Sequence, residues 1–140
     1  MNKIAGVLII ILALVIGILP QFTDCQSQGK ELTLTTGKTV PMKCHWTAIA
    51  EIGMAVPLIA QGIMLFLSKR KETRLALSVT NIILGIFVVL FPTWLIGVCA
   101  NNMMLCNNLM KPTLILCGAL VIVIGLITFI MAYRKVESVA

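Results

Sequence analysis

Charged residues are scarce in this sequence of 140 residues. They make up 11% of it, whereas 59% of the residues are hydrophobic, and the mean hydropathy is +1.05. Soluble globular domains usually carry about 25% charged residues. The scarcity of charge therefore excludes an ordinary soluble domain and predicts an integral membrane protein.

Two further absences limit the chemistry. No two cysteines have the Cys-x-x-Cys spacing that lowers the pKa of a nucleophilic thiol, which argues against a thiol-redox enzyme. There is only one histidine, His45, so a single chain cannot supply the two imidazoles of a bis-histidine haem site.

Four apolar stretches are long enough, or nearly so, to cross the roughly 30 Å hydrocarbon core of a bilayer as helices. They cover residues 4–20, 47–67, 75–97 and 113–132, and two outer loops cover residues 21–46 and 98–112. The first stretch follows Lys3 as a signal peptide would, but residues 18–25 lack the small residues of a cleavage site. We therefore expect an all-α membrane protein that forms one domain over residues 1–140, with four transmembrane helices.

The basic residues predict the orientation, because cytoplasmic flanks collect Lys and Arg. The link between the second and third helices contains Lys69, Arg70, Lys71 and Arg74, and the termini contain Lys3, Arg134 and Lys135. Both termini and this link are expected in the cytoplasm, with the protein in the plasma membrane. Since this topology accounts for the net charge of +6, no nucleic-acid partner is needed to explain it.

The two halves of the chain share a pattern of prolines and cysteines. Pro20 and Cys25 follow the first apolar stretch as Pro92 and Cys99 follow the third, and Met-Lys-Cys at 42–44 matches Met-Leu-Cys at 104–106. The pattern predicts two repeated helical hairpins related by a pseudo-two-fold axis along the membrane normal, with each proline ending a span. The alternative is a chance likeness, because any two apolar hairpins look alike.

The first outer loop contains alternating Leu and Thr residues at 32–35, then Gly37, then Thr39 and Val40. Alternation around a glycine turn is typical of a β-hairpin. Because an isolated hairpin is marginally stable in water, we expect it to be anchored by the two cysteines that flank it, Cys25 and Cys44.

Four of the five cysteines lie in the outer loops or at their edges. In an oxidising compartment they are expected to form two disulfides, for which three pairings are possible. Cys25–Cys44 and Cys99–Cys106 are favoured, because each closes a loop within its own repeat. Cys117 falls inside the fourth stretch and is expected to be a buried apolar residue.

A soft-metal or haem site is another possibility for the outer face. His45 offers an imidazole, and thioethers are near it in the expected topology, at Met42, Met54, Met103, Met104 and Met110. Histidine and methionine ligands suit copper(I) or haem iron. Methionine is also an ordinary filler of gaps between helices, so copper or haem remains an alternative to a protein without a cofactor.

Glu51 is expected about one turn inside the second helix. Inserting an ionised side chain costs about 2.5–3.5 kcal/mol at the membrane centre and less near the interface. Such a residue usually has a partner. Lys111, His45 and Thr47 are the candidates for Glu51, and a structural ion pair and a ligand- or proton-binding role both stay open. The amides of Gln61 and Asn81 are expected to pair with each other deeper in the bundle.

Three short motifs resemble a known family. They are Cys-His-Trp-Thr-Ala-Ile-Ala-Glu at residues 44–51, Met-Leu-Cys-Asn at 104–107 and Lys-Pro-Thr-Leu at 111–114. Together they resemble a family of small four-helix bacterial membrane proteins of unknown function, over nearly the whole chain. Genes of that family often neighbour MacB-like ABC transporters, which implies an accessory role. The resemblance gives no catalytic residues to carry over to this chain.

These observations predict a non-enzymatic accessory or regulatory subunit of an ABC-type membrane transport complex, with a permease as its partner. The alternatives are an outer-face haem- or copper-binding membrane protein and, third, a thiol-redox membrane protein. The residues expected to contact a ligand or partner are His45, Trp46, Glu51, Met54, Met104, Asn107 and Lys111.

Overall fold

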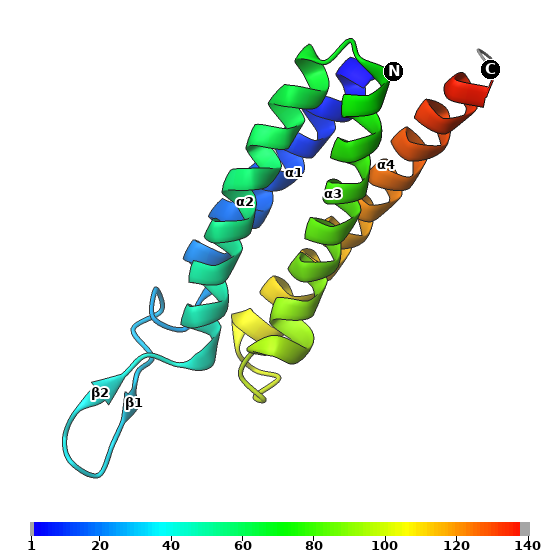
Figure 1. The fold of residues 1–140 in the computed structure, drawn as a ribbon. Helices are drawn as coiled ribbons and strands as arrows, with labels where there is room; N and C mark the ends of the chain where they lie inside the picture. Colours follow the sequence, from blue (N-terminus) through cyan, green and yellow to red (C-terminus); the bar gives the residue numbers. More distant parts are fainter. Residues whose placement is uncertain (1, 138–140) are drawn as a thin grey trace.

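The computed structural model describes residues 2–137, and four long helices dominate it (Figure 1). The helices are α1 (Asn2–Thr23), α2 (Lys43–Leu67), α3 (Lys71–Leu90) and α4 (Lys111–Glu137). All four are long and apolar enough to cross a membrane. The predicted all-α fold with four transmembrane helices is confirmed, and the protein is a multi-pass membrane protein.

The ends of the helices differ from the predicted spans. Pro20 was expected to end the first span, but it is buried inside α1, which continues to Thr23. Pro92 lies in η1 (Phe91–Leu95), a π-helical turn that prolongs α3. A proline removes one backbone N–H, and near the end of a membrane helix local adjustment of the backbone accommodates this loss. The prediction that each proline ends a span was therefore wrong.

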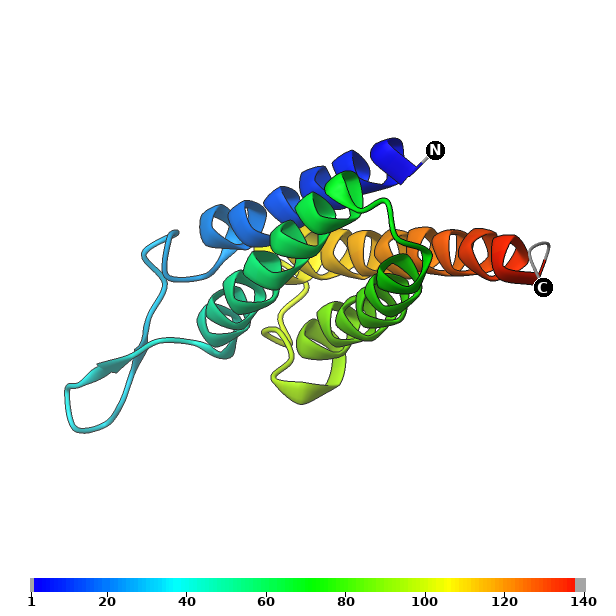
Figure 2. The ribbon, with the colours of Figure 1, turned by 45° about the horizontal axis from the view of Figure 1, so that its top comes forward.

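The helices pack as two hairpins, α1 with α2 and α3 with α4 (Figures 1 and 2). Glycines allow the close approach within each hairpin. A Cβ atom added at Gly62 would lie 2.6 Å from Ile10 Cγ1 and 3.0 Å from the Gly6 carbonyl oxygen, and one added at Gly118 would lie 3.0 Å from the Gly85 carbonyl oxygen. Small residues at such crossings are the usual means of packing helices in a membrane, where apolar burial contributes little.

The first helices of the two hairpins bury matching positions. A gap-free alignment that places Pro20 on Pro92 also matches four other pairs of buried residues: Ile16 with Val88, Ala13 with Gly85, Ile9 with Asn81 and Gly6 with Ser78. The packing of α1 in its hairpin is thus repeated by α3, as the duplicated sequence pattern predicts.

The second helices match in the same way. With Cys44 placed on Cys106, Ala48 falls on Met110. The second half then has one extra residue, where the π-helical turn η2 (Cys106–Met110) leads into α4. Beyond it the buried pairs are Glu51 with Leu114, Ala55 with Gly118, Leu58 with Val121, Gly62 with Gly125 and Leu65 with Thr128. The α1–α4 and α2–α3 seams between the hairpins are consequently equivalent under the repeat.

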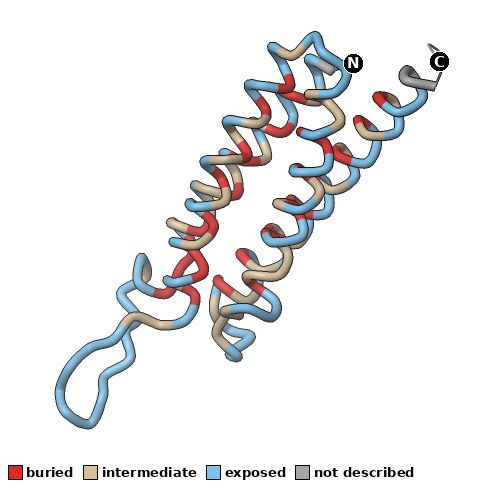
Figure 3. Tube along the Cα trace, in the orientation of Figure 1, coloured by how far each residue is buried: buried red, intermediate tan, exposed pale blue. Residues whose placement is uncertain are grey.

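A small β-hairpin projects from the bundle (Figure 1), and its residues are exposed (Figure 3). Strands β1 (Leu32–Thr33) and β2 (Thr39–Val40) are antiparallel, with Leu32 opposite Val40. Gly37 has a φ of 78° in the turn between them, a conformation that glycine adopts without strain. The predicted hairpin is confirmed.

Both loops between the helices of a hairpin lie at one end of the bundle, while the link at 68–70, the start of α1 and the end of α4 lie at the other (Figure 1). We call the first the cysteine end, because residues 24–46 and 96–106 bring four cysteines there. Both π-helical turns, η1 and η2, also lie at this end. Such turns are rare and occur frequently at functional sites.

Candidate functional site

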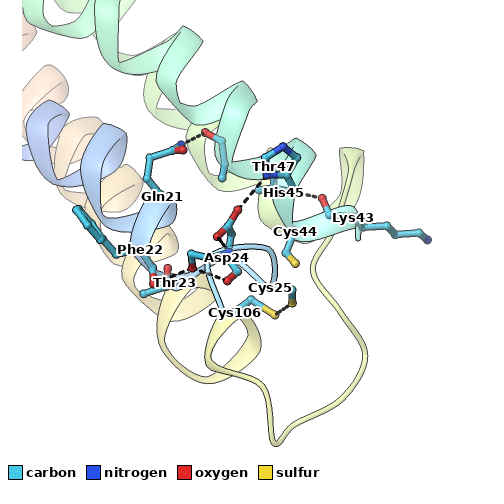
Figure 4. A network of polar contacts seen from close by, with 12 residues as sticks. Gln21, Phe22, Thr23, Asp24, Cys25, Lys43, Cys44, His45, Thr47 and Cys106 are labelled. Atoms are coloured by element: carbon cyan, nitrogen blue, oxygen red, sulfur yellow. Dashed lines mark hydrogen bonds and ion pairs between the residues drawn. The ribbon is translucent and has the colours of Figure 1, made fainter. Parts of the chain in front are cut away.

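Four cysteines form a cluster at the cysteine end. Cys25 follows α1, Cys44 is in the first turn of α2, Cys99 follows η1, and Cys106 begins η2. Their four Sγ atoms all lie within 4.8 Å of one another. Cys25 Sγ is 3.3 Å from Cys106 Sγ (Figure 4). It is 3.5 Å from Cys99 Sγ, and Cys44 Sγ is also 3.5 Å from Cys99 Sγ.

All five cysteines are free thiols in this structure. The predicted disulfides Cys25–Cys44 and Cys99–Cys106, and with them a disulfide-closed hairpin, are therefore not confirmed. The three closest sulfur contacts join different hairpins, because the two loops fold against each other over the end of the bundle. Cys117 is a buried thiol within α4, as expected from the sequence.

Two thioethers lie beside the cluster. Met42 Sδ is 3.7 Å from Cys99 Sγ, and Met104 Sδ is 3.8 Å from Cys25 Sγ. Each methionine precedes a cysteine of its own hairpin by two residues and contacts a cysteine of the other hairpin. Met103 is instead exposed. Four thiols thus lie together between the hairpins, and each thioether contacts one of them.

The pKa values of Cys25 and Cys99 are shifted in opposite directions. Burial raises the pKa of Cys25, and contacts with the neighbouring thiols raise it further. Burial also opposes ionisation of Cys99, but the thiols of Cys44, Cys25 and Cys106 stabilise its thiolate, so the pKa of Cys99 lies below its ordinary value. Cys99 is also the most exposed of the four. The thiolate of Cys99 is thus favoured, and the thiolate is the form that binds metals.

An aspartate and the histidine form a pair next to the cysteines. His45 Nδ1 lies 3.0 Å from Asp24 Oδ2, and the Ser27 backbone N–H donates to Asp24 Oδ1 at 2.8 Å (Figure 4). Burial raises the pKa of Asp24, but these hydrogen bonds outweigh it and hold the pKa below its ordinary value. The pair fixes the loop after α1 to the first turn of α2.

Asp24 was not among the residues that the sequence indicated. The available signal was its position, because Asp24 precedes Cys25 as His45 follows Cys44. His45 is not part of the four-cysteine group, and the structure does not test whether it binds a metal.

The remaining predicted residues lie around this end without meeting at one point. Trp46 is exposed, and its ring stands edge-on to His45 with centroids 6.2 Å apart. Asn107 Nδ2 donates to Asn102 Oδ1 at 2.7 Å. Met54 packs against the core of the bundle, and Lys111 begins α4.

Glu51 is fully buried, and neither of its oxygens has a hydrogen-bond partner among the described residues. The expected pairing with Lys111 or His45 is not formed. Thr47, the third candidate, donates instead to the Gly97 carbonyl oxygen at 2.8 Å. The expected pairing of Gln61 with Asn81 is also absent, because neither polar atom of the Asn81 amide has a partner in the described chain.

The fold and the cluster define a class of protein: a multi-pass membrane protein of two repeated helical hairpins whose loops gather four cysteines at one end. The chain belongs to the family described as a domain of unknown function, DUF4418, whose model matches residues 4–131. Comparisons with curated proteins and with solved structures gave no match.

Proposed function

We propose that this protein binds a thiophilic metal ion, copper(I) or zinc(II), through Cys25, Cys44, Cys99 and Cys106 at the outer face of the membrane. The observation that carries the proposal is the position of the four Sγ atoms within 4.8 Å of one another. A tetrahedral ion with metal–sulfur distances of about 2.3 Å separates its ligand atoms by about 3.8 Å. The closest contacts, 3.3 to 3.5 Å, need only a small expansion to reach that spacing.

The donor set selects soft ions. Thiolates and thioethers favour copper(I) and zinc(II) over hard cations such as magnesium. Four cysteines suffice for zinc, while the thioethers of Met42 and Met104 offer additional ligands that suit copper(I). The proposed function is binding of the ion without catalysis.

The test is metal analysis of protein purified under reducing conditions, followed by titration with zinc(II) or with copper(I). We expect one equivalent of tightly bound ion and an ultraviolet thiolate-to-metal absorption with copper. Cys44→Ser and Cys106→Ser should abolish both. Cys117→Ser is the matched control, because Cys117 is a free thiol outside the cluster, and it should bind as the unmodified protein does.

Two results would overturn the proposal. One is the absence of metal uptake by the fully reduced protein. The other is equal uptake by Cys44→Ser and the unmodified protein. In a third outcome, the four cysteines of the native protein form disulfides that cannot be reduced without unfolding. That outcome would also contradict the proposal and would favour a structural role of the cysteines.

A second candidate function is that of an accessory subunit of an ABC-type transport complex. It is favoured by two apolar grooves, one between α1 and α4 and one between α1 and η2. Ile4, Leu8, Ile127 and Met131 line one groove, and Leu14, Ile18, Phe22 and Leu109 line the other. A transmembrane helix of a permease would fill such grooves with apolar contacts.

This candidate is tested by photo-crosslinking in cells. A photoreactive amino acid at Leu8 or Ile18 should capture a permease subunit, whereas one at Ile83, an exposed position on α3, should not. Labelling of the same permease from all three positions, or from none, would contradict the assignment of the partner to the grooves beside α1.

A further inference from the structure

Three side chains with unpaired buried polar atoms lie on the two helices that meet along the α2–α3 seam. Both oxygens of Glu51, both polar atoms of the Asn81 amide and Gln61 Oε1 are buried and have no hydrogen-bond partner among the described residues. Unpaired polar groups in a membrane interior are costly, and ionisable residues kept there are usually functional.

The internal repeat shows that the fold does not require these polar groups. Glu51 is equivalent to Leu114, Asn81 to Ile9, and Gln61 to Ile124. Leu114 and Ile9 are as fully buried as their polar counterparts. The chain thus contains the apolar version of the same packing, and the unpaired polar residues are contributed by α2 of the first half and α3 of the second.

Among the described residues, the unpaired buried polar atoms are confined to α2 and α3, on Glu51, Gln61 and Asn81. The polar residues that line the grooves beside α1 are Thr23 and Thr128, and each donates its hydroxyl to a carbonyl of its own helix. If the fold needed such polar residues for stability, both equivalent seams would contain them. Their presence on α2 and α3 alone points to a ligand at the α2–α3 seam.

The three residues are spaced through the depth of the bundle. With a rise of 1.5 Å per residue, Gln61, Asn81 and Glu51 lie about 9, 15 and 24 Å from the helix ends at the link 68–70. Glu51 is also about 10 Å along α2 from Cys44. Polar atoms therefore extend from the cysteine end toward the opposite end.

Glu51 is the principal ionisable group in this interior. Between the charged ends, α1 and α3 carry no ionisable side chain, and α4 carries only Cys117. The described contacts of Glu51 include no cation. A lone carboxylate that lacks both a cation and hydrogen-bond donors is stabilised when it takes up one proton, which cancels its charge.

We propose that Glu51 is a proton-binding site in the membrane interior, and that it exchanges its proton along the α2–α3 seam past Asn81 and Gln61. In each cycle the carboxylate accepts one proton from a water molecule or hydronium ion that enters the seam, and later returns it to water. No electron transfer or other covalent change is involved. This inference does not depend on metal binding by the cysteines.

Infrared difference spectroscopy of the protein in lipid bilayers tests the proposal. A carboxylic-acid C=O band should be present at acid pH, disappear as the pH is raised, and shift when water is replaced by D2O. Both effects should be lost in Glu51→Gln and Glu51→Leu, and kept in the control Glu31→Gln, which changes an exposed glutamate before β1.

The leucine variant separates proton binding from a structural role. Because the repeat has Leu114 at this position, Glu51→Leu should fold with an unchanged or higher Tm while losing the band. Asn81→Ile should keep the band but slow its exchange in D2O at least tenfold. The proposal is overturned if the band is absent or insensitive to pH, if it survives in Glu51→Gln, or if sodium and not pH controls it.

Discussion

Cys25 Sγ lies 3.3 Å from Cys106 Sγ, although 81 residues separate the two cysteines in the sequence. Cys25 belongs to the α1–α2 hairpin and Cys106 to the α3–α4 hairpin. Cys44 and Cys99 make a second contact of this kind at 3.5 Å. The cysteines therefore connect the two hairpins at the end where their loops meet, whereas each hairpin is held together internally by its glycine crossings.

Controlled oxidation of the metal-free protein should reveal this arrangement. We expect the disulfides Cys25–Cys106 and Cys44–Cys99, because these sulfur atoms are in closest contact between the hairpins. Peptide mapping without reduction measures the pairing. Recovery of Cys25–Cys44 and Cys99–Cys106 would instead show that each loop closes within its own repeat and that the contacts between hairpins do not determine the pairing.

Gly62→Ala should destabilise the α1–α2 hairpin. The added Cβ would lie 2.6 Å from Ile10 Cγ1 and 3.0 Å from a backbone oxygen, and overpacking of this kind costs about 1–3 kcal/mol. Thermal unfolding in detergent measures the effect. Gly53→Ala is the control, because a Cβ there meets no atom within 4 Å, and equal Tm values for both variants would contradict the packing argument.

Asp24→Asn should loosen the connection between the loop after α1 and the start of α2. Hydrogen bonds to a charged group contribute about 1.5–3 kcal/mol, and Asp24 accepts them from Ser27 and pairs with His45. We therefore expect a lower Tm near neutral pH and faster proteolysis of residues 26–42.

The effect of Asp24 should depend on pH in a definite direction. Its pKa in the folded protein lies below the ordinary value of 3.8. The stabilisation by ionised Asp24 is thus fully present above pH 3.8 and is lost as the pH falls through the lower, folded-state pKa. The Tm difference between the unmodified protein and Asp24→Asn should shrink over that acidic range, and a difference that grows there would contradict the assignment.

Much of this architecture follows from local sequence signals. Long apolar runs predicted the four helices, and alternation around Gly37 predicted the β-hairpin. The sequence could not indicate which cysteines meet, because that depends on how two separate loops pack over the bundle. Glu51 was singled out by its charge in an apolar helix, but the absence of a partner was visible only once the four helices were in place.

The repeat supplies the residue for a last substitution, Asn81→Ile. Asn81 is fully buried with both amide atoms unpaired, and its counterpart Ile9 is fully buried in the other hairpin. An unsatisfied buried polar group costs about 1–3 kcal/mol, so isoleucine should raise the free energy of unfolding by up to that amount. The reverse change, Ile9→Asn, should lower it by a similar amount. Both are measured by reversible unfolding in mixed micelles. If Asn81→Ile is destabilising, Asn81 has a structural partner in the folded protein, and the two seams differ in packing as well as in polarity.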